Sequence, residues 1–117
     1  MFDLSEELKK LKESAKLDNL GMILIHNGVV RATSKDGKPV KGMNLTFNRQ
    51  KLDKLKDRLQ SMDFIEGVVI WINEGRLKIG DDIMYVIIAG NRREKLLPIF
   101  QKTIEEIKTE IVEEIEE

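Results

Sequence analysis

A pair of arginines, Arg92 and Arg93, directly follows a break between a strand pattern and a helix pattern. The run Ile83–Ala89 before them is apolar and rich in β-forming residues, which is typical of a buried strand. Gly90 allows a sharp exit from that strand, and Asn91 is a good N-cap for the helix pattern that follows. Because free N–H groups at a helix start attract anions, the two arginines stand at a candidate anion site. The alternative is that both are solvated surface charge.

Lys108 is a second candidate for chemistry, because it lies beside an apolar stripe. The closing helix pattern repeats apolar residues every three or four positions, at Leu96, Phe100, Ile104, Ile107, Ile111 and Ile115. Lys108 comes one residue after Ile107 and is therefore at the edge of that stripe. A lysine that is desolvated there becomes suited to nucleophilic use. The alternative is an ordinary lysine that lays its stem on apolar surface and keeps its ammonium group in water.

Three other features carry less specific signals. His26 lies inside a strand pattern, and we expect a packed or half-exposed strand residue there rather than a ligand. Trp71 is the only tryptophan, and we expect it in the core or in an interface. The loop at 34–39 has basic residues around it, at Arg31, Lys35 and Lys38, which would suit a mobile lid, although most such loops only connect strands.

These residues have to be positioned by the elements that the hydrophobic pattern predicts. An amphipathic helix is expected from Ser5, its N-cap, to about residue 16. We expect strands at 20–31, 40–47, 63–73 and 83–89, with a bulge at Gly28. A second helix is expected at 49–62, capped by Asn48, and a tight turn at 75–82.

A long helix closes the chain in this prediction. It opens at Asn91, carries the apolar stripe to Ile115, and is bent or delayed by Pro98. The order helix, strand, strand, helix, strand, strand, helix indicates an α+β fold with a mostly antiparallel sheet and flanking helices. We expect a single domain over residues 1–117.

Composition excludes several classes of function. In the 117 residues, 20 lysines and arginines nearly balance 21 aspartates and glutamates, so no overall field favours nucleic acid. There is no cysteine and only one histidine, which argues against disulfides, metal sites and a cysteine nucleophile. No metal and no cofactor are therefore expected. The charged N-terminal segment and the lack of a long apolar run predict neither a signal peptide nor a membrane span, so we expect a cytoplasmic protein.

The order of several short motifs resembles the large, catalytic subunit of molybdopterin synthase. Gly21 and Gly28-Val29-Val30-Arg31 fit the family's G…G-x-V-R strand, which leads into a flexible loop. The run at 75–81, Gly-Arg-Leu-Lys-Ile-Gly-Asp, matches its G-x-L-x-[I/V]-G-[D/E] motif. Ala89-Gly90-Asn91-Arg92 matches its A-x-H-R motif, with asparagine in place of histidine. Ile107-Lys108-Thr109 fits its leucine-lysine pair if one extra residue is allowed near Pro98, and the similarity is strongest over residues 20–109.

This resemblance implies both a fold and a chemistry. The fold would be the α/β hammerhead of that family. The family's subunit binds a ubiquitin-like small subunit whose C-terminal Gly-Gly ends in a thiocarboxylate, and it transfers sulfur to a cyclic pterin phosphate precursor in molybdenum cofactor biosynthesis. By resemblance, Arg31, Arg92 and Asn91 would bind the precursor phosphate, and Lys108 would act on the acyl or pterin carbon. The partner brings the sulfur, so this subunit needs no cysteine.

A homodimer at the centre of a heterotetramer is also implied by the resemblance. Arg92 and Lys108 are 16 residues apart, which is about 24 Å in a straight helix at about 1.5 Å per residue. One chain therefore cannot bring both to one small ligand, and we expect the site to be completed across the two-fold axis. The strand around Trp71 is the candidate contact.

Two alternative functions remain open from the sequence. Where the family has a proline-aromatic-Trp-Lys segment with a second functional lysine, this chain has the acidic run at 111–117. Acidic side chains repel a phosphate, so a non-catalytic family member with a regulatory or assembly role is one alternative. A weaker alternative is an unrelated α+β anion-binding module. A neighbouring gene for a ubiquitin-like protein ending in Gly-Gly would favour the catalytic function.

Overall fold

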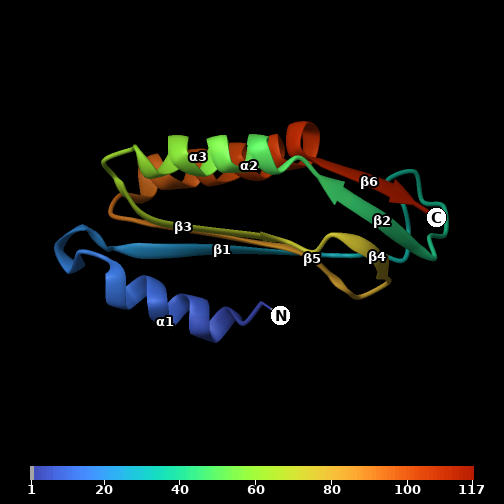
Figure 1. Cartoon of the computed structure of the whole chain (residues 1–117), viewed down its shortest axis with the longest axis horizontal. Helices are drawn as coiled ribbons and strands as arrows, with labels where there is room; N and C mark the ends of the chain where they lie inside the picture. The colour runs from blue at the N-terminus through green and yellow to red at the C-terminus, as the bar shows by residue number, and fades with distance from the viewer. Residues whose placement is uncertain (1) are drawn as a thin grey trace.

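The strands form two three-stranded antiparallel sheets, which are drawn in Figure 1. The computed structural model describes residues 2–117. Its elements are α1 (Leu4–Ser14), η1 (Leu17–Asn19), β1 (Met22–Val29), β2 (Gly42–Phe47), α2 (Arg49–Gln60), β3 (Ile65–Ile72), β4 (Gly75–Lys78), β5 (Asp82–Gly90), α3 (Arg93–Glu106), η2 (Ile107–Ile111) and β6 (Val112–Glu116). The first sheet has the order β1-β5-β3 and the second the order β4-β2-β6. The α+β class expected from the sequence is confirmed.

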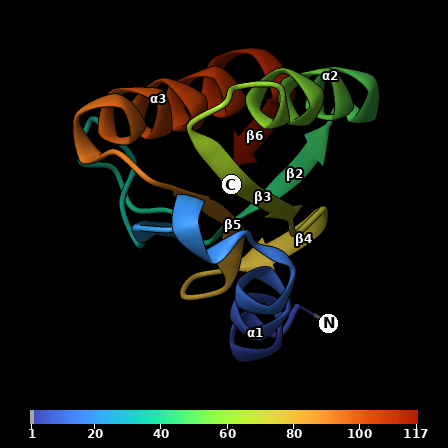
Figure 2. The same cartoon turned by 90° about the vertical axis from the view of Figure 1, so that its left-hand side faces the viewer.

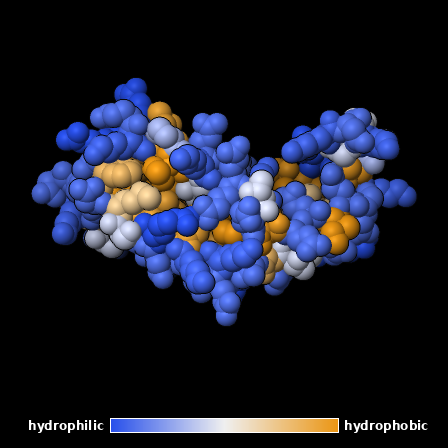
Figure 3. All heavy atoms as spheres, turned by 90° about the horizontal axis from the view of Figure 1, so that it is seen from above, coloured by the Kyte–Doolittle hydropathy of each residue, from blue (hydrophilic) through white to orange (hydrophobic). Residues whose placement is uncertain are grey.

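Helices cover both faces of the first sheet (Figure 2). On one face lie α2, α3 and the turn η2, which bury leucines and isoleucines against the strands, among them Leu52, Leu55, Leu59, Leu96 and Ile107. The three leucines of α2 form the single stripe that the sequence predicts. Seen from the helix side, polar side chains cover most of the outer surface, and the outline is notched between the two ends of the molecule (Figure 3). Each buried leucine contributes about 1.5–3 kcal/mol, so this layer is the main core.

The opposite face of the first sheet is covered by α1. Leu11 of α1 is buried against Ile87 and Ala89 of β5. Further along the same face, the Phe2 ring stacks on Trp71 at a centroid distance of 5.3 Å and on Tyr85 at 4.8 Å. These contacts make a second, smaller core, and they place Trp71 half-buried beside a helix rather than in the main core.

Local signals in the sequence set several boundaries of the elements. Asn48 caps α2 as predicted, because its side chain accepts a hydrogen bond from the Lys51 N–H at 3.0 Å. The register of β1 against β5 shifts directly after Gly28, where the bulge was expected. The cap of α1 is Asp3 rather than Ser5, and Asp3 accepts from the Glu6 N–H at 3.1 Å. The Ser5 prediction was therefore wrong by two positions.

The second sheet contains the two elements that the sequence analysis assigned incorrectly. The expected turn at 75–82 begins with β4, which pairs with β2, and only the residues around Gly80 form the turn itself. The closing helix leaves α geometry after Glu106, continues as the π turn η2 only to Ile111 instead of reaching Ile115, and β6 then returns along the other edge of β2. In a continued helix, glutamates three and four residues apart would be neighbours on the surface and would repel one another. Pairing with β2 instead satisfies the backbone hydrogen bonds and lets Arg76 contact Glu117 at 3.0 Å.

Candidate functional site

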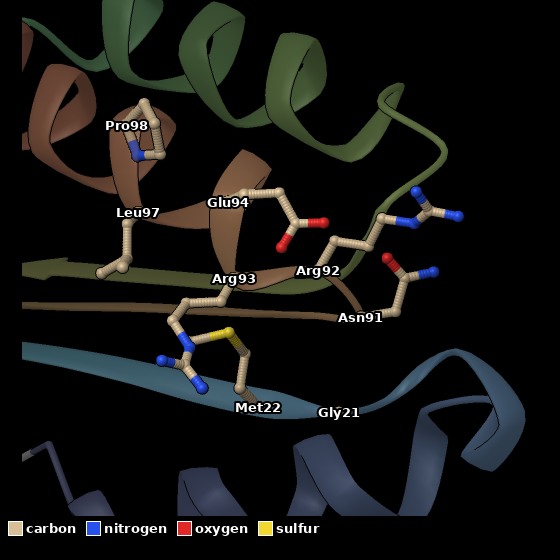
Figure 4. A pocket seen from close by; sticks show the side chains of 8 residues that line it. All are labelled: Gly21, Met22, Asn91, Arg92, Arg93, Glu94, Leu97 and Pro98. Atoms are coloured by element: carbon tan, nitrogen blue, oxygen red, sulfur yellow. The ribbon is translucent and has the colours of Figure 1, made fainter.

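The start of α3 borders a groove of about 810 Å³ on the surface, shown in Figure 4. Its lining comes from the β5–α3 junction, the start of β1 and the first turns of α3: Gly21, Met22, Asn91, Arg92, Arg93, Glu94, Leu97 and Pro98. β5 ends on Gly90, which lies so close to the Phe64 carbonyl oxygen that a Cβ there would overlap it. The groove is therefore built at the helix N-terminus that the sequence predicts.

Arg92 and Arg93 point to different sides of this N-terminus in Figure 4. Arg93 extends over Met22 of β1, whereas Arg92 extends away from β1 on the side of Asn91. Arg92 also lines a smaller hollow of about 300 Å³ together with Lys95 and Asp63. Within residues 2–117, neither arginine has an ion-pair partner. Both guanidinium groups can thus bind an anion at the helix start, where the sequence analysis placed this pair.

Asn91 is held by a chain of side-chain hydrogen bonds and does not cap the helix. The N-cap position of α3 belongs to Arg92, so the prediction for Asn91 was wrong by one residue. The Asn91 amide donates to Asn19 Oδ1, and Asn19 Nδ2 donates to Glu66 Oε2 at 2.7 Å. The backbone N–H of Lys16, followed by the Asn19 amide, lowers the pKa of Glu66, so this carboxylate is charged at neutral pH. Asn91 therefore ties the β5–α3 junction to Asn19 in η1 and, through Asn19, to Glu66 on β3.

Lys108 lies at the other end of α3, in the π-helical turn η2. Single π turns recur at functional sites because they reorient side chains within a helix. The turn is held from α2: the Asn48 N–H donates to the Ile111 carbonyl at 2.9 Å, and Lys51 Nζ donates to the Glu110 carbonyl at 3.3 Å. Just before it, Arg58 forms two hydrogen bonds to Glu106, at 2.6 and 2.7 Å. Lys108 itself is exposed.

Pro98 does not interrupt α3. The helix is continuous from Arg93 to Glu106, with Pro98 inside it, so the regular part is not delayed as expected. The irregular place in the helix is η2.

Arg31 lies at the end of the first sheet opposite to Arg92. The pairing of β1 with β5 starts with Met22 against Gly90 and ends with Val29 against Asp82. The strand β1 has eight residues, which span roughly 25 Å at about 3.3 Å each. Arg31 follows this strand and is exposed. Within one chain, Arg31 and Arg92 are therefore separated by about the length of β1, whose path is visible in Figure 1.

His26 lies in the middle of β1, the strand that leads to Arg31. The side chain is half-buried, as the sequence analysis expects for a strand residue. Burial, followed by the positive charge of Lys108, lowers the pKa of His26 below its ordinary value of 6.5. Lys108 and Arg31 thus lie away from the start of α3, where Asn91, Arg92 and Arg93 are found. No short motif in the sequence marks His26.

The family model described as MoaE protein matches residues 2–110 of the chain. The chain belongs to the MoaE family. The resemblance seen in the sequence is therefore confirmed. Membership in the MoaE family supports a role in molybdenum cofactor biosynthesis.

Solved structures show the same fold at low sequence identity. Molybdopterin synthase from Staphylococcus aureus matches with a TM-score of 0.74 and 18% identity over 99% of this chain and 86% of the other. The complex of subunits 1 and 2 of the molybdopterin-converting factor from Helicobacter pylori matches with a TM-score of 0.72 and 18% identity, over 98% and 78%. The MoaE protein of Burkholderia ambifaria gives 0.73 and 20% identity, over 98% and 83%. Comparison with curated protein sequences returns no match.

Within residues 2–117, no helix has the length and apolar character needed to cross a membrane.

Proposed function

We propose that this chain is the large, catalytic subunit of a molybdopterin synthase. It would transfer sulfur from a ubiquitin-like small subunit with a C-terminal Gly-Gly thiocarboxylate to a cyclic pterin phosphate precursor. The observation that carries the proposal is the match of the MoaE family model to residues 2–110, which include every residue assigned to the site. The relative from Helicobacter pylori is a complex of two subunits, which supports a small-subunit partner for this chain.

The proposed roles follow from the residue types and their surroundings. Lys108 presents an exposed ammonium group on a turn held by α2, and it supplies charge and protons at the reacting acyl or pterin carbon. Arg31 and Arg92 bind the precursor phosphate, because a guanidinium group is always charged and binds phosphate with two parallel hydrogen bonds. Arg93 adds a third guanidinium group beside Arg92. Asn91 positions the junction that carries both of these arginines.

A homodimer is needed to unite these residues at one ligand. Arg92 and Lys108 lie at opposite ends of α3, a helix of 14 residues, which is about 21 Å long at about 1.5 Å per residue. A two-fold axis brings the start of one α3 to the end of the other. The outer strand β1 offers a contact, because Ile25 and Val29 on it leave 43% and 44% of their surface exposed, and pairing along this sheet edge would keep both α3 helices on the same face. Exposed apolar side chains gathered on one face are typical of a protein interface.

The assay for this function is reconstitution from purified parts. The full chain is incubated with a thiocarboxylated small subunit and the pterin precursor, and dithiolene is measured over time. We expect dithiolene to form only when all three components are present. The same mixture with a small subunit that ends in an ordinary carboxylate is the control. Absence of dithiolene with a thiocarboxylated partner that demonstrably binds would contradict the catalytic function.

A non-catalytic role is favoured by one specific observation. The strand β6 places Glu113, Glu114 and Glu116 on the second sheet, directly after the turn that carries Lys108. Acidic groups in this position oppose binding of a phosphorylated substrate near Lys108. A chain that binds the small subunit but makes no dithiolene would therefore be assigned a regulatory or assembly role in the same pathway.

A further inference from the structure

A chain of side-chain hydrogen bonds ends on Asn91, the residue before Arg92 at the groove. The chain begins at Glu66 on β3, whose Oε1 accepts from the backbone N–H of Lys16 at 2.7 Å. Its other oxygen, Oε2, accepts from Asn19 Nδ2, also at 2.7 Å. Asn19 Oδ1 then accepts from Asn91 Nδ2. Two asparagine amides therefore connect a carboxylate on β3 to the start of α3.

The carboxylate of Glu66 fixes the direction of every bond in this chain. An ionised carboxylate can only accept hydrogen bonds, so Asn19 has to turn its amide nitrogen toward Glu66. The same nitrogen lies 3.4 Å from the carbonyl oxygen of Asp63, which also only accepts. Asn19 Oδ1 is thus left to face Asn91, which has to donate. Reversing either amide would set two acceptors against each other, so the direction is unambiguous.

The oxygen of the Asn91 amide is the atom that remains for a ligand. Asn91 is exposed and lines both the groove of about 810 Å³ and the hollow of about 300 Å³. Its one side-chain hydrogen bond within residues 2–117 is made by the nitrogen. In Figure 4 the oxygen, in red, lies on the side of Arg92, and the nitrogen lies on the side away from it. This position therefore offers an acceptor beside guanidinium groups that donate.

A ligand with both donors and acceptors fits this arrangement. Phosphate oxygens accept, so they match the guanidinium groups and are repelled by an amide oxygen. A pterin ring carries N–H and amino groups, which donate. We propose that Glu66 and Asn19 are positioning residues that orient Asn91, whose Oδ1 atom accepts a hydrogen bond from an N–H group of the pterin ring. Asn91 then reads the ring, not the phosphate that the resemblance implies for it. The choice of a pterin rests on the proposed function, whereas the direction of the chain does not.

NMR of the side-chain amides tests the chain without any ligand. The signals of the Asn91 amide in a ¹H–¹⁵N spectrum are identified by their loss in Asn91→Ala. We expect these signals to shift in Glu66→Ala, because Asn19 carries the loss of the carboxylate to Asn91. Glu74→Ala, which removes an exposed glutamate just after the same strand, is the matched control and leaves them in place. Unshifted Asn91 signals in Glu66→Ala would overturn the proposal.

Equilibrium binding of two probes, the pterin phosphate precursor and inorganic phosphate, tests what Asn91 recognises. In Asn91→Ala we expect the Kd for the precursor to rise about fivefold, the effect of one hydrogen bond. The Kd for inorganic phosphate stays within about twofold, because Arg92 and Arg93 are intact. Glu66→Ala should change the two constants in the same unequal way.

Three results of this binding measurement would overturn the proposal. They are an unchanged Kd for the precursor in folded Asn91→Ala, equal losses for both probes, and a wild-type chain that does not bind the precursor. Equal losses would assign Asn91 to the phosphate. A wild-type chain that shows the unequal losses but makes no dithiolene contradicts the proposed catalytic function alone.

Discussion

Lys108 is exposed, and the turn that carries it is held by other residues, namely Asn48, Lys51 and Arg58. Replacing Lys108 by Ala should therefore abolish sulfur transfer while the melting temperature stays within a few degrees, as for most exposed positions. The measurement is dithiolene formation together with a thermal melt. Lys102→Ala is the control and keeps full activity. Full activity in Lys108→Ala, or loss of activity only in Lys102→Ala, would reject the assignment of Lys108.

His26 predicts a pH dependence of stability that is separate from activity. Burial and the Lys108 charge lower the folded pKa below 6.5, so the unfolded chain binds the proton at a higher pH than the folded chain. The free energy of unfolding should thus fall as pH decreases from about 6.5 through the folded pKa, and level off below it. Urea unfolding at a series of pH values measures this. His26→Phe should remove this part of the slope and, because it also removes Nε2, a buried nitrogen without a hydrogen-bond partner within residues 2–117, should be more stable at pH 7 by about 1 kcal/mol. An identical slope in both proteins contradicts the account.

At the scale of elements, the junction between β5 and α3 depends on the absence of a side chain at Gly90. A Cβ there would overlap the Phe64 carbonyl oxygen and lie 3.0 Å from Leu96 Cδ1. Gly90→Ala should lower the free energy of unfolding by about 2 kcal/mol or more, because backbone has to move to admit the methyl group. Gly28→Ala is the control, since its nearest contacts are ordinary ones at 3.5 Å and 3.6 Å. Chemical denaturation of both variants measures the difference, and equal losses would show that the junction is not tightly packed.

The elements that the sequence predicts well are those set by local signals. Asn48 and the leucine stripe define α2 to within two residues at its end, and the apolar runs define β3 and β5. The strands β4 and β6 could not be found in this way, because each exists through pairing with β2. The isoleucine spacing that continues to Ile115 fits a helix, yet Ile115 is 56% exposed on a strand. Local periodicity does not reveal a partner that is distant in sequence.

At the scale of the molecule, the site residues lie at two ends of the first sheet. The separation of Arg92 from Lys108 follows from helix geometry alone, so it could be stated from the sequence. The place of Lys108 in a π turn could not, because it depends on the turn η2, which is held by hydrogen bonds from Asn48 and Lys51. The sequence identified Arg93 as a candidate anion ligand, but it did not show on which side of the groove the Arg93 side chain lies.

The apolar patch on the outer strand β1, formed by Ile25 and Val29, should hold the homodimer together. Ile25 is 43% exposed, and a charged residue there would be desolvated in a dimer. Ile25→Glu should therefore shift a dimer to monomer in analytical ultracentrifugation without unfolding the chain. Leu17→Glu is the matched control, because Leu17 is apolar and 79% exposed but lies in η1, outside this patch. An equal dimer dissociation constant in both variants would show that the interface lies elsewhere.

The central claim is that Arg92 of one chain and Lys108 of its partner act on the same ligand. The most direct measurement mixes Arg92→Ala chains with Lys108→Ala chains, allows subunits to exchange, and compares dithiolene formation with that of each variant alone. Each mixed dimer contains one site with both residues intact, so a complete exchange should recover about one quarter of wild-type activity, because half of the dimers are mixed and each has one of two sites. Neither variant alone should exceed background. Background activity in a fully exchanged mixture, or a protein that is monomeric at micromolar concentration, would contradict the shared site.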